Sequence, residues 1–165
     1  MPFNSTDSLT STNMNNTLRG LYRDNSDHAV TGTTNETTLA TTTVTANTIG
    51  ATGILHVIAA GTITGAAGNK TVKLVLGSTT LLNSGATAGT ADWGLEAWIT
   101  NTATNAQRVR GIVTGLAAAT TYSFDFITGA EDTTADVVLK VTGTLTNGGD
   151  TITQKMFNVF VCQIT

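Results

Sequence analysis

The chain has 165 residues, the size of one ordinary domain and long enough to bury a core without disulfide staples. Charged residues make up only 12%, about half of the usual share, and the 8 basic and 11 acidic residues include no basic cluster that would follow a phosphate backbone. We therefore expect that the protein does not bind nucleic acid directly. The 37 threonines favour strands, because a β-branched side chain is tolerated better in a sheet than in a helix.

Nothing in the sequence indicates export or a membrane partner. The first residues, MPFNSTDSLTSTNMNN, lack the basic and apolar parts of a secretory signal. No run approaches the roughly 18 to 20 apolar residues that a membrane helix needs. The single cysteine, Cys162, lies in an apolar run, which predicts a buried and unreactive thiol. We expect a protein that is made in a cytoplasm and carries no disulfide.

Residues 1–34 differ from the rest, because they are rich in Asn, Ser, Thr and Asp and have only scattered apolar side chains. This composition predicts an extended N-terminal arm that a partner orders. Three of its apolar residues have the i, i+3, i+4 spacing of a helical face, but Gly20 weakens a helix by roughly 1 kcal/mol, so at most one or two turns are expected. The candidate partner-binding residues of the arm are Phe3, Leu9, Met14, Leu18, Leu21 and Tyr22.

From residue 35 to the end, short alternating runs of apolar and polar residues are separated by turn signals about every ten residues. Eight runs are found, at 36–46, 54–63, 70–76 with a continuation at 79–82, 94–101, 107–114, 121–127, 135–146 and 151–164. The segment NGGD at 147–150 predicts a hairpin that pairs the last two runs. Eight antiparallel strands without helix predict a jelly-roll sandwich over 35–165, with an up-and-down barrel as the competing architecture.

Alternation assigns the two tryptophans to opposite faces of one run. Trp93 shares its face with Leu95, Ala97 and Ile99, which predicts a core position, and Trp98 is the one expected to be exposed. In the run 135–146 the core stripe includes Val137, Leu139, Val141 and Leu145.

The sequence offers little for catalysis. His28 lies in the arm, and His56 lies opposite Leu55 and Val57 on its run, so a surface strand position is the simpler interpretation. A G-x-S-x-G elbow, a phosphate loop and a Cys/His zinc spacing are all missing. We expect no enzymatic activity, no metal and no cofactor.

Four carboxylates gather in the segment FDFITGAEDTTAD, at Asp125, Glu131, Asp132 and Asp136. They lack the D-x-D-x-D-G order of a calcium loop, and a solvated acidic turn is the simpler interpretation.

Arg108 and Arg110 share a face of the run 107–114. They are possible partner contacts together with Trp98, although a plain solvated strand face explains the arginines equally well. Asp92 and Glu96 flank the two tryptophans, and this group could bind a sugar ring that stacks on an indole.

Five segments occur in order along the last two thirds of the chain: NKTVKLVLG at 69–77, DWGLEAWI at 92–99, AQR at 106–108, VVLKVTG at 137–143 and DTITQKMFNVFV at 150–161. In these segments the chain resembles jelly-roll structural proteins of tailed bacteriophages, including capsid decoration (cement) proteins and related tail-fibre domains. The segments are strand and turn patterns, so they indicate a shared fold more directly than a shared role.

The resemblance implies a structural virion protein that stabilises the outside of the capsid as a homotrimer. Its partners would be further copies of itself and the major capsid protein, which the arm would grip. The alternative is a receptor-binding tail-fibre or spike tip that recognises a host glycan through Trp93, Trp98 and the acidic segment.

Overall fold

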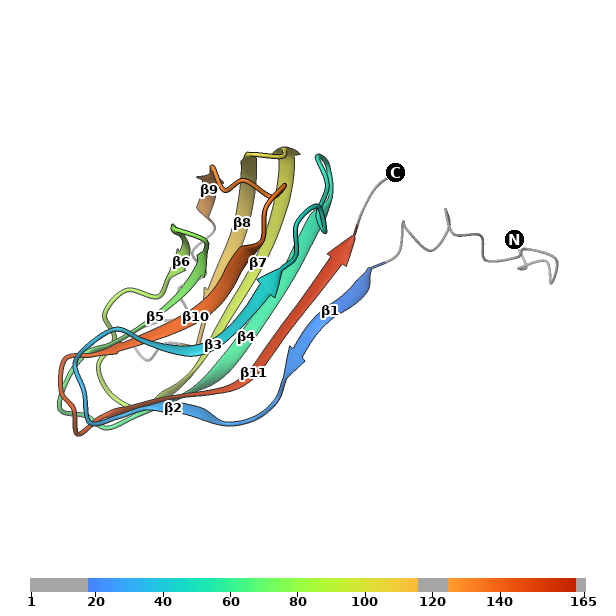
Figure 1. Cartoon of the computed structure of the whole chain (residues 1–165). Helices are drawn as coiled ribbons and strands as arrows, with labels where there is room; N and C mark the ends of the chain where they lie inside the picture. The colour runs from blue at the N-terminus through green and yellow to red at the C-terminus, as the bar shows by residue number, and fades with distance from the viewer. Residues whose placement is uncertain (1–17, 116–124, 163–165) are drawn as a thin grey trace, which may run out of the picture.

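A computed structural model describes residues 18–115 and 125–162. Every regular element in these ranges is a strand, and eleven strands form two antiparallel sheets (Figure 1). The predicted all-β class is confirmed, whereas the strand count differs from the eight that were predicted. The strands lie in two separate sheets rather than in the single closed sheet of an up-and-down barrel.

The larger sheet has seven strands in the order β1-β11-β4-β7-β8-β9, with β2 also paired to β11. Its strands are β1 (Arg19–Asp24), β2 (His28–Val30), β4 (Ile54–Thr64), β7 (Ala91–Ala103), β8 (Ala106–Thr114), β9 (Asp125–Gly129) and β11 (Thr151–Cys162). The smaller sheet has the order β3-β10-β5-β6. Its strands are β3 (Thr37–Val44), β5 (Lys70–Leu76), β6 (Thr79–Asn83) and β10 (Val137–Leu145).

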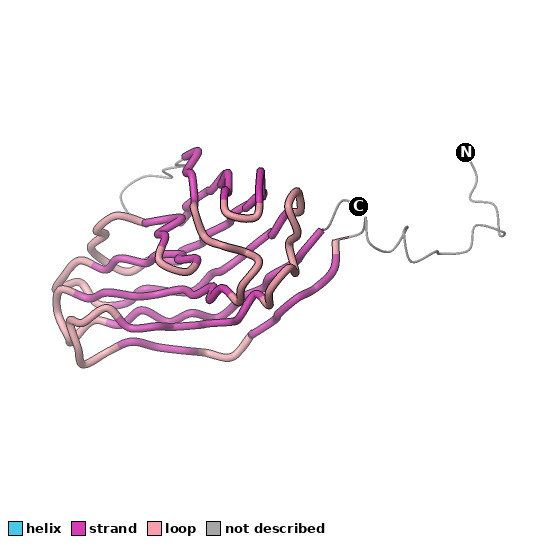
Figure 2. Tube along the Cα trace, turned by 45° about the horizontal axis from the view of Figure 1, so that its top comes forward, coloured by secondary structure: helices cyan, strands magenta, loops and turns pink. Residues whose placement is uncertain are grey.

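The described elements are strands joined by loops (Figure 2). One hydrophobic core lies between the two sheets, because each strand turns every second side chain inward. The predicted stripe of Trp93, Leu95, Ala97 and Ile99 is buried there, as are the four predicted core residues of β10. Trp93 is 2% exposed, which confirms its assignment to the core.

The predicted pairing of the last two runs is wrong. β10 pairs with β3 and β5, whereas β11 pairs with β1, β2 and β4, so the turn at 147–150 crosses from one sheet to the other. The reason is that each strand already has neighbours on both sides in its own sheet, and Asp150 of this turn is buried.

Residues 19–30 of the predicted arm belong to the larger sheet. Gly20 lies opposite Phe160 of β11, and Tyr22 packs against Phe157 with ring centroids 5.7 Å apart. The predicted helical turn is wrong, because the backbone there bonds to β11 and the side chains of Leu21 and Tyr22 pack against the core. Leu18 is 56% exposed. Phe3, Leu9 and Met14 lie outside the described residues.

Candidate functional site

The outer face of the larger sheet is unusually apolar for a surface. Strand β4 reads ILHVIAAGTIT, with Leu55, Val57 and Ala59 turned into the core and Ile54 and Ile58 turned outward. An antiparallel strand with one face in water normally alternates apolar and polar residues, whereas an apolar sequence on both faces is typical of a strand covered on both sides. We call this outer surface, formed mainly by β4, β7, β8 and β11, the apolar face.

Four side chains stand in register in a row across the apolar face. Phe160 of β11 pairs with His56 of β4, His56 pairs with Trp98 of β7, and Trp98 pairs with Arg110 of β8. The His56 and Trp98 rings are stacked, with centroids 4.8 Å apart and planes 13° apart, and Phe160 follows at 6.0 Å. The Arg110 guanidinium carbon lies over the Trp98 ring, 5.5 Å from its centroid. We call these four residues the stacked row.

Glu96 holds the imidazole of the stacked row in place. It occupies the next outward position on β7, two residues before Trp98, and its Oε1 lies 2.7 Å from Nε2 of His56. The contact fixes the plane of the imidazole against the indole. The prediction that His56 is a strand-surface residue is confirmed, since its side chain is partly exposed on the outer face.

The stacked row presents ring edges rather than ring faces. Strands β4 and β8 flank β7 on its two sides, so His56 covers one face of the Trp98 indole and Arg110 lies over the other. Sugars bind aromatic side chains through an open ring face, and neither face of Trp98 is open in this arrangement. A ridge of edges with N–H donors is better suited to contact with a protein surface.

The structure separates the residues that the glycan alternative grouped together. Trp93 is buried in the core and cannot stack on a ligand, because alternation places it on the inner side of β7. Trp98 and the exposed Arg108 and Arg110 do meet, and with Thr100 and Thr102 they line a shallow hollow of about 400 Å³.

The acidic segment holds the loop before β10 to its neighbours. Oε1 of Glu131 accepts hydrogen bonds from the amide and hydroxyl of Ser78 and from the hydroxyl of Thr79, at 2.7–2.9 Å. Burial opposes ionisation of Glu131, but these hydrogen bonds outweigh it and lower the pKa of its carboxyl. The prediction of a solvated turn therefore fails for Glu131, while Asp132 and Asp136 are exposed as expected. The side chain of Asp125 lies outside the described residues.

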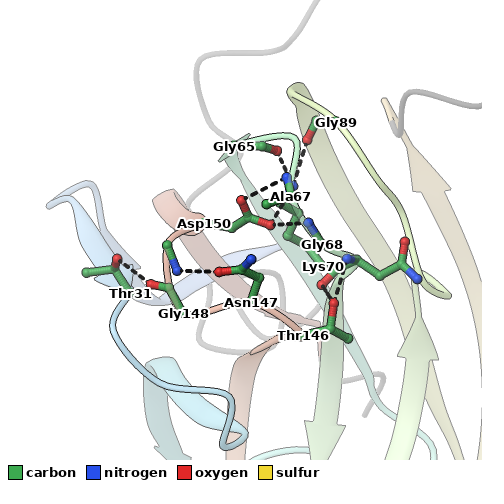
Figure 3. Close-up of polar contacts among 12 residues, drawn as sticks. Thr31, Gly65, Ala67, Gly68, Lys70, Gly89, Thr146, Asn147, Gly148 and Asp150 are labelled. Atoms are coloured by element: carbon green, nitrogen blue, oxygen red, sulfur yellow. Dashed lines mark hydrogen bonds and ion pairs between the residues drawn. The ribbon is translucent and has the colours of Figure 1, made fainter.

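A buried ion pair, unforeseen from the sequence, ties together the loops at one end of the molecule (Figure 3). Nζ of Lys70 lies 3.0 Å from Oδ2 of Asp150, and the two side chains are 0% and 2% exposed. Lys70 also donates to the carbonyls of Gly65 and Gly89, and the carboxylate of Asp150 accepts from two backbone amides of the β4–β5 loop. We call this pair and its loop contacts the loop clamp.

The loop clamp has an electrostatic signature. Burial by itself opposes ionisation of Asp150, but the hydrogen bonds from Lys70 and from the two amides outweigh it and lower the pKa of this carboxyl. The alternating pattern of the sequence could have indicated that both residues face inward. Lys70 falls on the same side of its strand as the buried Val72 and Leu74, and Asp150 falls on the same side as the buried Ile152.

In the ranges 18–115 and 125–162, no group of three or more His, Cys, Asp or Glu side chains is placed to hold a metal ion. The same ranges contain no helix long and apolar enough to cross a membrane. Comparison with protein-family models, with curated proteins and with solved structures gives no match.

Proposed function

We propose that this chain is a structural protein of a tailed-bacteriophage particle, a homotrimeric decoration protein that binds the major capsid protein on the outside of the shell. The observation that carries the proposal is the apolar face, a half-buried surface of aromatic and aliphatic side chains on an otherwise threonine-rich domain. Surfaces of this kind mark protein interaction sites. The resemblance of the strand and turn segments to phage jelly-roll proteins supplies the identity of the particle.

The strand pairing supports a jelly roll. Rolling up one long antiparallel hairpin pairs the first strand with the last, the second with the next to last, and so inward. The broken strand β1/β2 pairs with β11, β3 with β10, β4 with β7, and β5 with β6, which follows this rule. Strands β8 and β9 extend the larger sheet beyond that framework. We infer that the domain is a jelly roll with two additional strands.

A non-catalytic role agrees with the way the charged side chains are used. Lys70 and Asp150 clamp the loops, Glu131 holds Ser78 and Thr79, and Glu36 accepts hydrogen bonds from Lys73 and Thr142 at 2.7 Å. These groups are engaged in holding one loop or strand to another. Their positions therefore support a scaffold that works through its surface.

The capsid-binding arm of this proposal is shorter than residues 1–34, because 19–30 form two strands of the larger sheet. We place it at residues 1–17, which carry Phe3, Leu9 and Met14. Three arms in a trimer raise the effective concentration of one another, so weak individual contacts together bind firmly.

Deletion of residues 2–17 tests the proposal, because it leaves β1 intact. Full-length protein should sediment with undecorated capsids, and the truncated protein should remain folded and trimeric but stay in the supernatant. A truncated protein that still decorates shells would overturn the role of the arm. A full-length protein that never sediments with them would overturn the capsid proposal itself.

The second candidate is a glycan-binding tip, which the hollow beside Trp98 favours because it combines an indole edge, two guanidinium groups and threonine hydroxyls. Trp93 is buried, so quenching of tryptophan fluorescence on addition of a glycan would report on Trp98. Saturable quenching by a host surface glycan would support this candidate, and a flat titration would count against it.

A further inference from the structure

We propose that the apolar face is the surface through which copies of this chain associate, with the stacked row near its centre. The inference rests on the proposed homotrimer and goes beyond it by naming the interface. It commits to a second copy of the chain as the occupant of the face.

The first support is the contrast in side chains between the two outer faces. The apolar face carries half-buried apolar residues on four neighbouring strands: Ile54, Ile58, Ala60, Trp98, Ile112, Met156 and Phe160. On the smaller sheet the outward positions are mostly Thr and Lys, with Val75 and Val138 as the apolar exceptions: Thr38, Thr41 and Thr43 of β3, Thr71, Lys73 and Val75 of β5, and Val138, Lys140, Thr142 and Thr144 of β10. Both sheets contribute to the same core, so core packing explains the inner faces and not this difference.

The composition of the apolar face matches that of a protein interface. Interfaces are enriched in aromatic residues, Met and Arg and are depleted of charge at their centres. Strand β4 has no Asp, Glu, Lys or Arg, and its outward neighbours include Trp98, Phe160, Met156 and Arg110. Truncation of Trp and Arg at such centres weakens binding more than truncation of other residues.

The size of the face is sufficient for a stable contact. The four strands of the apolar face, spaced about 4.8 Å apart, span about 14 Å, and the eleven residues of β4 span about 36 Å. Their product is roughly 500 Å² on each partner, and the resulting total of about 1,000 Å² reaches the lower bound expected for a biological interface. A small ligand would leave most of this surface in water.

Charge permits like copies to meet there. The whole chain carries a formal charge of −3, so repulsion between copies is weak at physiological salt. All four arginines lie on β1 and β8, toward the two edges of the larger sheet. Between these strands, Lys155 of β11 pairs with Asp27, and Glu96 of β7 contacts His56. Both charges have partners within the chain, so this layout does not call for a strongly charged partner.

Two variants test the interface, and one variant serves as the control. Trp98→Ala removes the indole of the stacked row, and Ile58→Lys adds a charge at an outward position of β4 where a long side chain can reach water. Val138→Lys makes the same kind of change on the opposite face, where Val138 is 44% exposed. Circular dichroism and thermal unfolding identify any variant that fails to fold.

Light scattering over a concentration series gives the mass of each protein in solution. We expect wild-type protein and Val138→Lys to be trimers, and Trp98→Ala and Ile58→Lys to dissociate with a dissociation constant raised roughly 30-fold or more. If the folded variants remain trimers with an unchanged dissociation constant, the apolar face is not the interface, although the protein is still a homotrimer. A monomeric wild-type protein would overturn self-association, and sedimentation of that monomer with capsids would still support decoration.

Discussion

The stacked row and the loop clamp use similar chemistry in different surroundings. Both join a cationic side chain to partners on neighbouring strands or loops, but Lys70 is fully buried, whereas Arg110 is exposed. In the loop clamp the ammonium of Lys70 and the carboxylate of Asp150 have their partners inside the protein, so these contacts stabilise the fold. In the stacked row the ring edges reach the surface, where another protein can contact them. Burial, more than residue type, therefore separates the structural cluster from the candidate interface.

The largest expected effect comes from breaking the loop clamp. Lys70→Met leaves the Asp150 carboxylate buried without its counter-charge, and we expect the melting temperature to fall by roughly 10 °C. Lys73→Met is the matched control, because Lys73 lies on the same strand but pairs with Glu36 at the surface. It should shift the melting temperature by no more than about 2 °C. Thermal unfolding followed by circular dichroism measures both, and equal shifts would mean that burial is not what distinguishes the two lysines.

The next effect is a loss of stability in acid. The pKa values of Asp150 and Glu131 are lowered in the folded protein. A carboxyl with a lowered pKa contributes stability that is present above its unfolded pKa and is lost as the pH falls through the folded pKa. The melting temperature should therefore be nearly flat above about pH 5 and should fall below about pH 4.

Glu131→Gln isolates one part of this acid effect. The variant should melt lower than wild type at pH 7, because Ser78 and Thr79 lose a charged acceptor, and its further loss between pH 5 and pH 3 should be smaller. The measurement is the melting temperature at pH 7, 5, 4 and 3. A slope identical to that of the wild-type protein would show that Glu131 keeps the same proton affinity on unfolding.

A smaller effect on the stability of the fold is expected in the stacked row. Trp98→Ala removes one ring stack and one cation–π contact at a partly exposed site, which together stabilise the domain by about 1.5 kcal/mol. Trp93→Ala is the comparison, because it empties a core site and should cost about 3 to 5 kcal/mol. Urea unfolding of the dissociated proteins at low concentration separates these values from the effect on association. Equal losses for the two tryptophans would contradict the assignment of Trp98 to the surface.

The smallest effect is expected on the outer face of the smaller sheet. Val138→Thr places one more threonine beside Thr43, and we expect a change within about 0.5 kcal/mol in the free energy of unfolding. Association should also be unchanged. A loss of trimer in this variant would move the interface to the smaller sheet.

Much of the strand pattern was accessible from the sequence, because alternation depends only on neighbouring residues. It placed Trp93 in the core, Trp98 on the surface and His56 on the outward side of β4. It failed at β1, where helical spacing and strand pairing competed for Leu21 and Tyr22. A short segment of this kind is decided by the neighbour it finds, and that neighbour, β11, lies more than 120 residues further along the chain.

The candidate site could be predicted only in part for the same reason. Arg110 and Trp98 were identified from their own runs, but their contact and the stack with His56 depend on the register of three strands. Phe160 joins the site, and Glu96 meets His56, only when β11, β4 and β7 lie side by side.

By itself the sequence determined the all-β class, the faces of most strands and the low charge of the surface, because these follow from composition and from a period of two. The tertiary structure alone decided which strands are neighbours, that the turn at 147–150 crosses between sheets, and that Lys70 meets Asp150 in the interior. Pairing between strands is set by hydrogen bonds and packing between residues that are far apart in the chain. The alternation within one strand shows which side chains face inward but does not show which strand pairs with it.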